Sequence, residues 1–297
     1  MILITGASGF LGKSIIKYFL SLDKSILTIG RNDCSNIKCD LSSEIPYIDR
    51  EPVDIVIHAA GKAHLIPITE AQKQSFFDVN LTGTNNLLKA LENLDSLPRY
   101  FIFISSVAVY GQEIGININE QSPLYAKDPY GLSKIQAEHL VTNWCQKNNI
   151  ICTILRLPLL VGKNPPGNLG AMIKGIKKSY YFNIGGGTAK KSMVLAKDVA
   201  QFIPKVAHIG GIYNLTDGVN PTFFELSKAI AKKKIFNLPL FVVKVFGFLG
   251  NFLGEKAPIN TLKINKIISD LTFDESKARE LGWKPRSVLE YLKDNNL

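Results

Sequence analysis

The amino-acid sequence predicts an α/β protein with a doubly wound parallel sheet and a smaller C-terminal lobe. Short apolar runs such as 2–5 and 54–58 are typical of strands that are buried on both faces of a sheet. They alternate with longer segments of helical periodicity, and this order favours parallel strands joined by right-handed helical crossovers. The chain has 297 residues, of which 46% are hydrophobic, so it can bury such a core without disulfides.

The first half of the chain shows this alternation most clearly. Strands are expected at 2–5, 26–30, 54–58, 100–105 and 150–156, and helices at 10–22, 70–94 and 129–148. In the first of these helices, Leu11, Ile15 and Phe19 fall on or near one face. We therefore assign residues 1–157 to the sheet domain.

The regular alternation ends after Pro158. Glycine, proline and asparagine crowd the segment 159–170, which predicts a loop, and 185–188 predicts another. Beyond Pro158, helices are expected at 171–178, 196–203, 222–231 and 274–282, a strand at 213–215, and a terminal turn at 283–285. We expect 158–297 to form mainly the smaller lobe, interleaved with the last elements of the sheet.

The segment 238–253, LPLFVVKVFGFLGNFL, is strongly apolar. It is too short to span a bilayer comfortably and Lys244 interrupts it, so we expect a buried helix of the smaller lobe and no membrane contact. The alternative is an exposed apolar surface that faces a membrane or a partner. Lys228 and the lysines at 232–234 precede the segment and keep that alternative open.

The composition excludes several classes of function. The net charge of +10 attracts anionic ligands, but we expect most of it to be solvated surface lysine. No basic block is interleaved with aromatic residues, so nucleic-acid binding is not predicted. The four cysteines, Cys34, Cys39, Cys145 and Cys152, form no CxxC pair and have no histidine cluster beside them. We therefore expect no metal site, and reduced thiols in a cytoplasmic protein without a signal peptide.

A glycine-rich turn, TGASGFLG at 5–12, joins the first strand to the first helix. Gly6 permits the tight turn, Gly9 lets the backbone approach a pyrophosphate, and Gly12 lets the helix pack against the strand. The helix N-terminus offers free N–H groups and partial positive charge to the phosphates. We therefore predict a dinucleotide-binding (Rossmann) domain. The expected contacts of this loop are Gly6, Ser8, Gly9, Phe10, Leu11 and Gly12.

The end of the second strand indicates which dinucleotide binds. An acidic residue there would bind the ribose 2′-OH of NAD, whereas an arginine would accommodate the 2′-phosphate of NADP. Gly30 stands where the acid is expected, and Arg31 follows it. Arginine engages phosphate through two parallel hydrogen bonds. We predict NADP, with NAD as the alternative because Asp33 is close by.

Three residues form the candidate catalytic group. Tyr130 and Lys134 are four residues apart in a predicted helix, so their side chains share a face. Ser106 ends an apolar strand, and reactive groups gather at the carboxyl ends of such strands. In hydride transfer to a carbonyl, Ser106 can donate a hydrogen bond to the oxygen and Tyr130 can deliver the proton, so both would also contact substrate. Lys134, with oxidised nicotinamide, should favour the phenolate and can hold the nicotinamide ribose.

The glycine spacing GxxGxxG and the YxxxK motif resemble the short-chain dehydrogenase/reductase family. The stretches SSVAVYG at 105–111, LRLPLLVG at 155–162 and ELGW at 280–283 resemble its extended branch, which contains nucleotide-sugar epimerases, dehydratases and 4-ketoreductases. The resemblance covers nearly the whole chain. It implies that 1–157 binds NAD(P), that 158–297 mainly binds substrate, and that the chain forms a homodimer through two helices.

The resemblance also implies further cofactor contacts. Asp40 and Leu41 would lie beside the adenine, and Pro158 near the nicotinamide amide. The small residues after the fourth strand would leave room for the cofactor; these are Ala59, Ala60 and Gly61. Asn80 matches a family asparagine, although a helix-bundling or capping role is an equal alternative.

The expected substrate is a nucleotide-linked sugar, with uridine diphosphate as the carrier. GNLGAM at 167–172, which contains Asn168, resembles the nucleotide-binding segment of the UDP-glucose 4-epimerase-like subgroup of polysaccharide-precursor enzymes. Lys191, seven residues before Asp198, falls where many relatives carry an arginine for the substrate diphosphate. Lysine is a compact charge that cannot form the bidentate fork of arginine.

Three functions are compatible with these residues. The first is reduction of a UDP-linked 4-keto-6-deoxy sugar with NADPH, which Arg31 favours. The second is 4-epimerisation of a UDP-sugar with tightly bound NAD. The third is a sensor or assembly protein that binds NADP(H) without turnover. The set of Ser106, Tyr130 and Lys134 argues against the third, because binding alone requires no proton relay.

Overall fold

The computed structural model describes residues 1–49, 52–63, 65–231, 233–251 and 261–295. Its centre is a parallel sheet of seven strands in the order β11-β7-β5-β4-β1-β2-β3. The strands are β1 (Ile2–Thr5), β2 (Ile26–Gly30), β3 (Ile37–Lys38), β4 (Ile55–His58), β5 (Tyr100–Ser106), β7 (Ile151–Leu157) and β11 (Gly211–Asn214). The predicted parallel sheet is confirmed.

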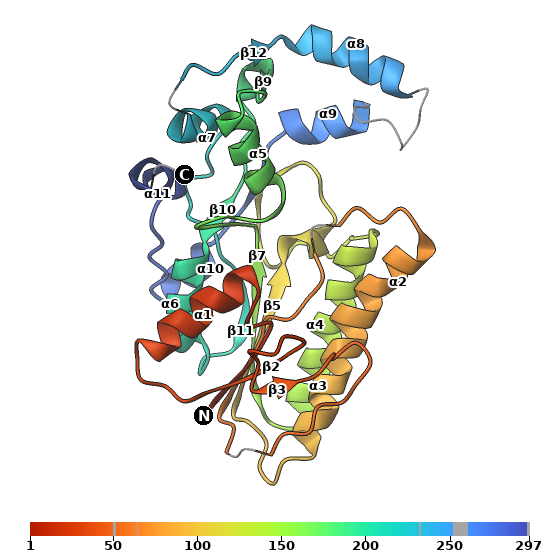
Figure 1. Cartoon of the computed structure of the whole chain (residues 1–297), viewed down its shortest axis with the longest axis vertical. Helices are drawn as coiled ribbons and strands as arrows, with labels where there is room; N and C mark the ends of the chain where they lie inside the picture. Colours follow the sequence, from red (N-terminus) through yellow and green to blue (C-terminus); the bar gives the residue numbers. More distant parts are fainter. Residues whose placement is uncertain (50–51, 64, 232, 252–260, 296–297) are drawn as a thin grey trace.

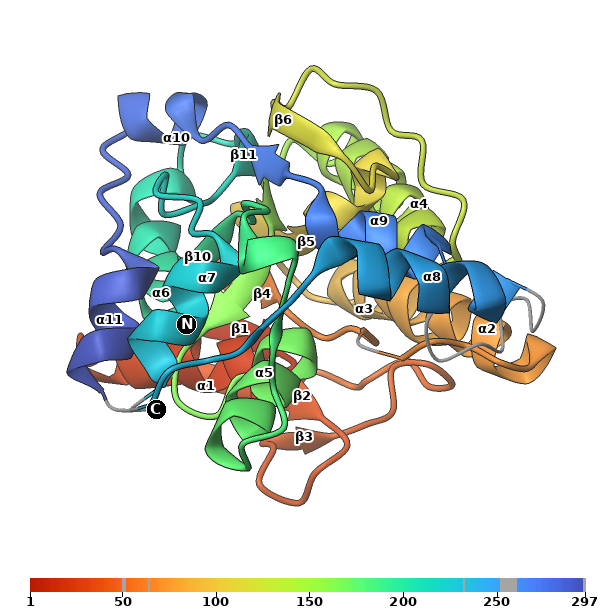
Figure 2. The same cartoon turned by 90° about the horizontal axis from the view of Figure 1, so that it is seen from above.

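Helices cover both faces of this sheet (Figures 1 and 2). On one face, α1 (Phe10–Leu20) and α6 (Ala196–Val206) pack on Ile2 and Ile4 of β1. On the other face, α3 (Gly83–Glu92) and α4 (Pro129–Lys147) pack around Leu3. Alternate residues of one strand thus enter opposite apolar cores, as expected of a strand with two covered faces. The doubly wound architecture is therefore confirmed.

The helix expected at 70–94 is interrupted. It consists of α2 (Glu70–Phe77), a π-helical turn over Asp78–Thr82, and α3. Thr69 begins α2 by accepting a hydrogen bond from the backbone N–H of Gln72. The π-helical turn carries the buried Asn80, and single π-turns of this kind are frequent at functional sites.

The smaller lobe has more regular structure than its glycine and proline content indicated. The loop expected at 159–170 is limited to 162–166, and the prediction is wrong at both ends, where β8 (Leu159–Val161) and the start of α5 (Gly167–Lys177) stand. Pro166 supplies the extended N-cap of α5, and Gly167 next to it has a φ of +66°. The residues that signalled a loop thus begin a helix.

Most of the rest of the lobe is built from short elements that lie over one end of the sheet (Figure 1). Three two-stranded pairs are formed by β8 with β10 (Met193–Leu195), β9 (Asn183–Ile184) with β12 (Asn237–Leu238), and β6 (Gly115–Ile118) with β13 (Leu271–Phe273). The helices are α7 (Phe223–Ile230), α8 (Leu240–Asn251), α9 (Thr261–Ile268), α10 (Ser276–Glu280) and α11 (Val288–Asp294). The loop expected at 185–188 is a 3₁₀ turn over Gly185–Gly187.

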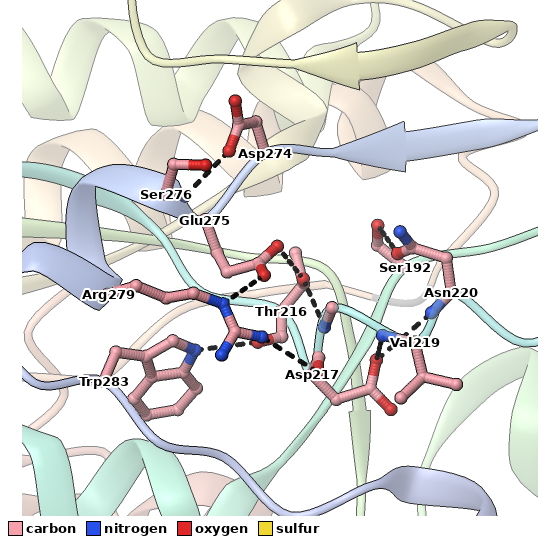
Figure 3. A network of polar contacts seen from close by, with 11 residues as sticks. Ser192, Thr216, Asp217, Val219, Asn220, Asp274, Glu275, Ser276, Arg279 and Trp283 are labelled. Atoms are coloured by element: carbon pink, nitrogen blue, oxygen red, sulfur yellow. Dashed lines mark hydrogen bonds and ion pairs between the residues drawn. The ribbon is translucent and has the colours of Figure 1, made fainter.

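A network of hydrogen bonds and an ion pair connects residues 275–283 with the chain just after β11 (Figure 3). Trp283 Nε1 donates to the carbonyl oxygen of Thr216 (2.8 Å), and the Thr216 hydroxyl donates to Glu275 (2.8 Å). Glu275 in turn pairs with Arg279 (2.6 Å). The Trp283 ring packs edge-on against Phe202 of α6, with the centroids 5.0 Å apart. The late part of the chain therefore contributes to the core on one face of the sheet.

Within the apolar segment 238–253, Leu238 ends β12 and residues 240–251 form α8, whereas 252–253 lie outside the described residues. Val243 is buried, but Phe241 and Val245 are exposed. The expectation of a buried helix is therefore wrong for this face. Among the described residues, no helix is long and apolar enough to cross a membrane.

Candidate active site

A cavity of about 660 Å³ opens at the carboxyl ends of β1, β4, β5 and β7. It brings together most of the predicted site: Gly6, Gly9, Phe10, Leu11, Gly12, Ala59, Ala60, Gly61, Ser106, Tyr130, Lys134 and Pro158. The glycine loop, the strand end and the YxxxK helix therefore line one cleft. This is the edge of a parallel sheet at which ligands of such folds bind.

The glycine loop is shaped by contacts that exclude larger residues. Gly6 has a φ of +70°, and a Cβ on it would lie 2.5 Å from the backbone of Ala59. A Cβ on Gly12 would lie 2.1 Å from the carbonyl oxygen of Gly6. Gly9 begins α1 with no side-chain cap, and the first turn of α1 contains no acidic residue. This cradle of backbone and free helix N–H groups fits the pyrophosphate of a dinucleotide.

Local capping positions Tyr130 and Ser106. The Asp128 carboxylate accepts from the Gly131 backbone N–H (3.0 Å), and Pro129 occupies the first turn of α4, so the helix begins just before Tyr130. The Ser106 hydroxyl accepts from the Ala108 N–H (3.2 Å) at the end of β5. A Cβ on Gly131 would lie 2.8 Å from the Ala108 carbonyl, so a glycine lets the two segments approach closely.

Tyr130 and Lys134, the two titrating residues of the candidate catalytic group, have shifted pKa values. Burial raises the pKa of Tyr130, and a hydrogen bond with Ser106 partly opposes this. Burial lowers the pKa of Lys134 to about 8, against the attraction of Glu138. The Lys134 ammonium donates to the Ile104 carbonyl (2.7 Å) and lies over the Phe103 ring (4.3 Å). The phenol is thus protonated near neutrality, and phenolate stabilisation by Lys134 stays a prediction for the cofactor-bound state.

Asn80 forms hydrogen bonds both with the segment that follows β4 and with α4, the helix that carries Tyr130. Its Oδ1 accepts from the Lys62 backbone N–H (2.7 Å), and its Nδ2 donates to the Lys62 carbonyl (3.1 Å) and the Ser133 hydroxyl (2.9 Å). A Cβ on Gly61 would lie 3.2 Å from Asn80 Oδ1. This amide holds the strand end that carries Gly61 against the helix that carries Tyr130.

A buried charge pair supports both β5 and α4. Glu138, one turn after Lys134, forms two hydrogen bonds with Arg156 (2.7 and 3.1 Å) and accepts a third from Ser105. The Arg156 guanidinium also donates to the hydroxyl of Tyr110 (3.1 Å). Tyr110, which helped to define the family resemblance, is fully buried and therefore supports the fold.

The predicted adenosine contacts lie outside the cavity described above. Arg31 approaches Asp40 at 3.9 Å, with its side chain 73% exposed. Asp40 accepts from the backbone and hydroxyl of Ser42, and the hydroxyl bond does most to hold its pKa below the usual range. Leu41 is buried in the core, and Ser8 is exposed on the glycine loop.

The two predicted substrate contacts beyond the trio are not brought into the cleft. Asn168 is exposed in the first turn of α5. Lys191 donates to the Lys266 carbonyl (3.0 Å), and burial lowers its pKa. The backbone of Lys191 forms an isolated parallel β-bridge with Leu271, which does line the cleft. The backbone of Lys191 is therefore the immediate neighbour of a cleft-lining residue.

Several lining residues were missed from the sequence. Lys62 follows the HAAG stretch directly and Gln112 follows the YG of the serine motif, so their positions were local signals. Phe273 lines the cleft from β13, and no local pattern in the sequence connects it with the site. Among the described residues, no cluster of histidine, cysteine and acidic side chains could hold a metal ion.

The fold and the cleft together define an NAD(P)-dependent enzyme of the extended short-chain dehydrogenase/reductase type. A family model described as "NAD dependent epimerase/dehydratase family" matches residues 2–215, and the chain belongs to this family.

Relatives span nearly the whole chain. The N-acetyl-α-D-glucosaminyl-diphospho-ditrans,octacis-undecaprenol 4-epimerase of Escherichia coli O157:H7 is 26% identical over 95% of this chain and 89% of its own length. The UDP-glucose 4-epimerase of Vibrio cholerae is 27% identical over 97% of this chain and 92% of its own length.

Two solved structures share the fold. A Thermotoga maritima UDP-glucose 4-epimerase with UDP-glucose has a TM-score of 0.74 at 18% identity, covering 98% of this chain and 96% of that one. A human epimerase family protein with NADPH has a TM-score of 0.73 at 16% identity, covering 99% of both.

Proposed function

We propose that this enzyme uses NADPH to reduce the C4 ketone of a nucleotide-linked 4-keto-6-deoxy sugar during polysaccharide-precursor synthesis. The observation that carries the proposal is the end of β2. Gly30 replaces the acid that would bind a ribose 2′-OH, and the exposed Arg31 makes a loose contact of 3.9 Å with Asp40. Asp33, the acid that would favour NAD, forms a similarly exposed pair with Lys38 (2.5 Å). Because exposed ion pairs are weak, Arg31 is available for a 2′-phosphate.

The site residues suit reduction in particular. A bound nicotinamide dinucleotide supplies the hydride to C4. Ser106 donates a hydrogen bond to the ketone oxygen, and Tyr130 delivers its proton to that oxygen. The raised pKa of Tyr130 keeps the phenol protonated, which is the state that reduction requires. The Lys134 ammonium, anchored on Ile104, then stabilises the phenolate that remains.

A second candidate is 4-epimerisation, which the names of the E. coli and V. cholerae relatives favour. It requires Tyr130 first to remove a proton from the C4 hydroxyl as a phenolate, the state that Lys134 and oxidised nicotinamide are predicted to favour. A sensor without turnover is disfavoured because Ser106, Tyr130 and Lys134 all line the cleft.

The remaining assignments belong to the same proposal. Residues 158–297 mainly supply the substrate lobe, with Asn168 and Lys191 on the side of the nucleotide diphosphate. Uridine diphosphate is the proposed carrier, and the active unit is a homodimer. The four cysteines are free, which fits the cytoplasm, where thiols stay reduced.

One experiment separates the candidates. Purified protein is analysed for bound dinucleotide, and NADPH absorbance is followed with UDP-4-keto-6-deoxy-N-acetylglucosamine. Consumption of NADPH supports the reductase. Interconversion of UDP-N-acetylglucosamine and its galacto epimer, or of a polyprenyl-diphosphate-linked N-acetylglucosamine and its epimer, without NADPH consumption supports the epimerase. Tight NADP(H) binding without either reaction supports the sensor.

A further inference from the structure

Helix α8 exposes an apolar face to solvent in the smaller lobe. Phe241 and Val245 are four residues apart on one side of the helix and are 71% and 57% exposed. Phe248, three residues further on, extends the same side, whereas Val243 on the opposite side is 3% exposed and packs inward. Phe236, just before the helix, is 84% exposed. Large apolar side chains gathered in this way mark an interaction surface.

Exposed lysines lie beside this face. Residues 226–254 contain five lysines and no acidic residue, so this stretch carries half of the net charge of +10. Lys233 and Lys234 are exposed close to Phe236. Lys244 is exposed at the edge of the apolar side of α8. The charge of the stretch is therefore complementary to an anionic surface, and its apolar side chains to an apolar layer.

We propose that the α8 face, comprising Phe236, Phe241, Val245 and Phe248 with Lys233, Lys234 and Lys244, docks on the surface of an anionic lipid bilayer. Aromatic side chains of interfacial helices enter the boundary between headgroups and acyl chains, and lysines pair with anionic headgroups. The helix lies in the plane of the interface, because no described helix is long enough to span.

A second copy of the chain is a poorer occupant of this face. A twofold interface would place the same patch on both subunits. The lysines of one patch would then meet those of the other, with no acidic residue between 226 and 254 to pair with them. Anionic lipid removes this repulsion.

The position of α8 relates docking to the cleft. Helix α8 packs against α9, which leads into β13, and Leu271 and Phe273 of β13 line the cleft. Figure 1 shows α8 beyond the carboxyl ends of the central strands, the end at which the cleft opens. Docking would thus hold the substrate side of the enzyme close to the membrane without requiring a catalytic residue to make lipid contact.

The test is flotation of the purified full chain with vesicles of phosphatidylcholine alone or with about one third phosphatidylglycerol, at low and high salt. We expect binding to the anionic vesicles only, weakened by salt because exposed charges are screened. Phe241→Glu/Val245→Glu should lower the partition coefficient about tenfold or more. Lys233→Gln/Lys234→Gln should lower it about fivefold for each lysine removed.

Matched controls place the same changes elsewhere on the surface. Leu20→Glu/Tyr47→Glu replaces two exposed apolar side chains, and Lys24→Gln/Lys147→Gln removes two exposed charges. Both should bind as the wild type does. No flotation of the wild type, or an equal loss in the controls, overturns the proposal. A dimer in light scattering that dissociates in Phe241→Glu/Val245→Glu assigns the face to a second copy and also overturns it. Because the vesicle assay needs neither cofactor nor substrate, its result is independent of the proposed reaction.

Discussion

At the residue scale, the proposed chemistry depends most directly on the phenol of Tyr130. Tyr130→Phe removes the proton donor and keeps the ring that packs near Phe76. We expect turnover to fall about 10²- to 10⁴-fold while the dissociation constant of NADPH changes little. Steady-state kinetics and a fluorescence titration measure the two effects. Tyr125→Phe, at an exposed tyrosine outside the cleft lining, is the matched control and should keep full activity. An unchanged rate in Tyr130→Phe would remove this phenol from the proton path.

Cofactor choice is also a matter of single residues. Arg31→Asp replaces the expected partner of the 2′-phosphate with a group that repels it and that can accept from a ribose 2′-OH. We expect NADPH affinity to fall about tenfold or more and NADH affinity to rise, measured by parallel titrations. Lys24→Asp makes the same charge change before the opposite end of β2 and should leave both affinities as they are. If the two variants behave alike, the change reflects net charge rather than recognition.

His58 gives the fold a defined pH dependence. Its ring lies between the hydroxyls of Thr5 (2.6 Å) and Thr84 (2.9 Å), and burial lowers its pKa to about 3. Below the ordinary histidine pKa of 6.5 the unfolded chain binds a proton that the folded chain excludes, so stability falls as pH falls. We expect His58 to account for about 2 kcal/mol of lost unfolding free energy between pH 7 and pH 5. Urea unfolding of the wild type and of His58→Gln should show that difference in slope, and equal slopes would contradict the assignment.

At the element scale, the Glu138–Arg156 pair joins α4 to β7 beneath the cleft. Glu138→Gln leaves the buried guanidinium without its counter-charge, which should cost about 3–5 kcal/mol in urea unfolding. The matched control is Asp54→Asn, which breaks the exposed Asp54–Arg99 pair (2.6 Å) and should cost about 1 kcal/mol or less. Comparable losses in the two variants would show that burial does not determine the strength of these pairs.

The elements that the sequence predicted are those whose signals are local. Apolar runs gave the main strands, and the glycine loop and YxxxK spacing identified the residues that line the cleft. The site residues that the sequence analysis did not identify are placed by contacts between distant parts of the chain. Gly115 of β6 pairs with Leu271 of β13, and Phe273 enters the cleft from that pairing. The start of α5 at Pro166 was also predicted wrongly, as loop, because proline breaks a helix internally but is favoured where a helix begins.

At the scale of the whole molecule, both parts of the chain contribute to the apolar cluster on one face of the sheet, and this predicts a single unfolding transition. Ile4 of β1, Phe202 of α6 and Trp283 belong to the same apolar cluster, although they come from opposite ends of the sequence. The chain has two tryptophans: Trp144 packs on Phe101 on one face of the sheet, and Trp283 packs on Phe202 on the other.

Each single-tryptophan variant, Trp144→Phe and Trp283→Phe, therefore reports on one face. We expect tryptophan fluorescence and far-ultraviolet circular dichroism to give coincident urea transitions within each variant. Trp283→Phe should also lose about 1–2 kcal/mol, because the Thr216 carbonyl loses its indole donor. Fluorescence and dichroism midpoints that separate within either variant would show that the smaller lobe unfolds on its own, and that the polar network of Figure 3 does not couple it to the sheet.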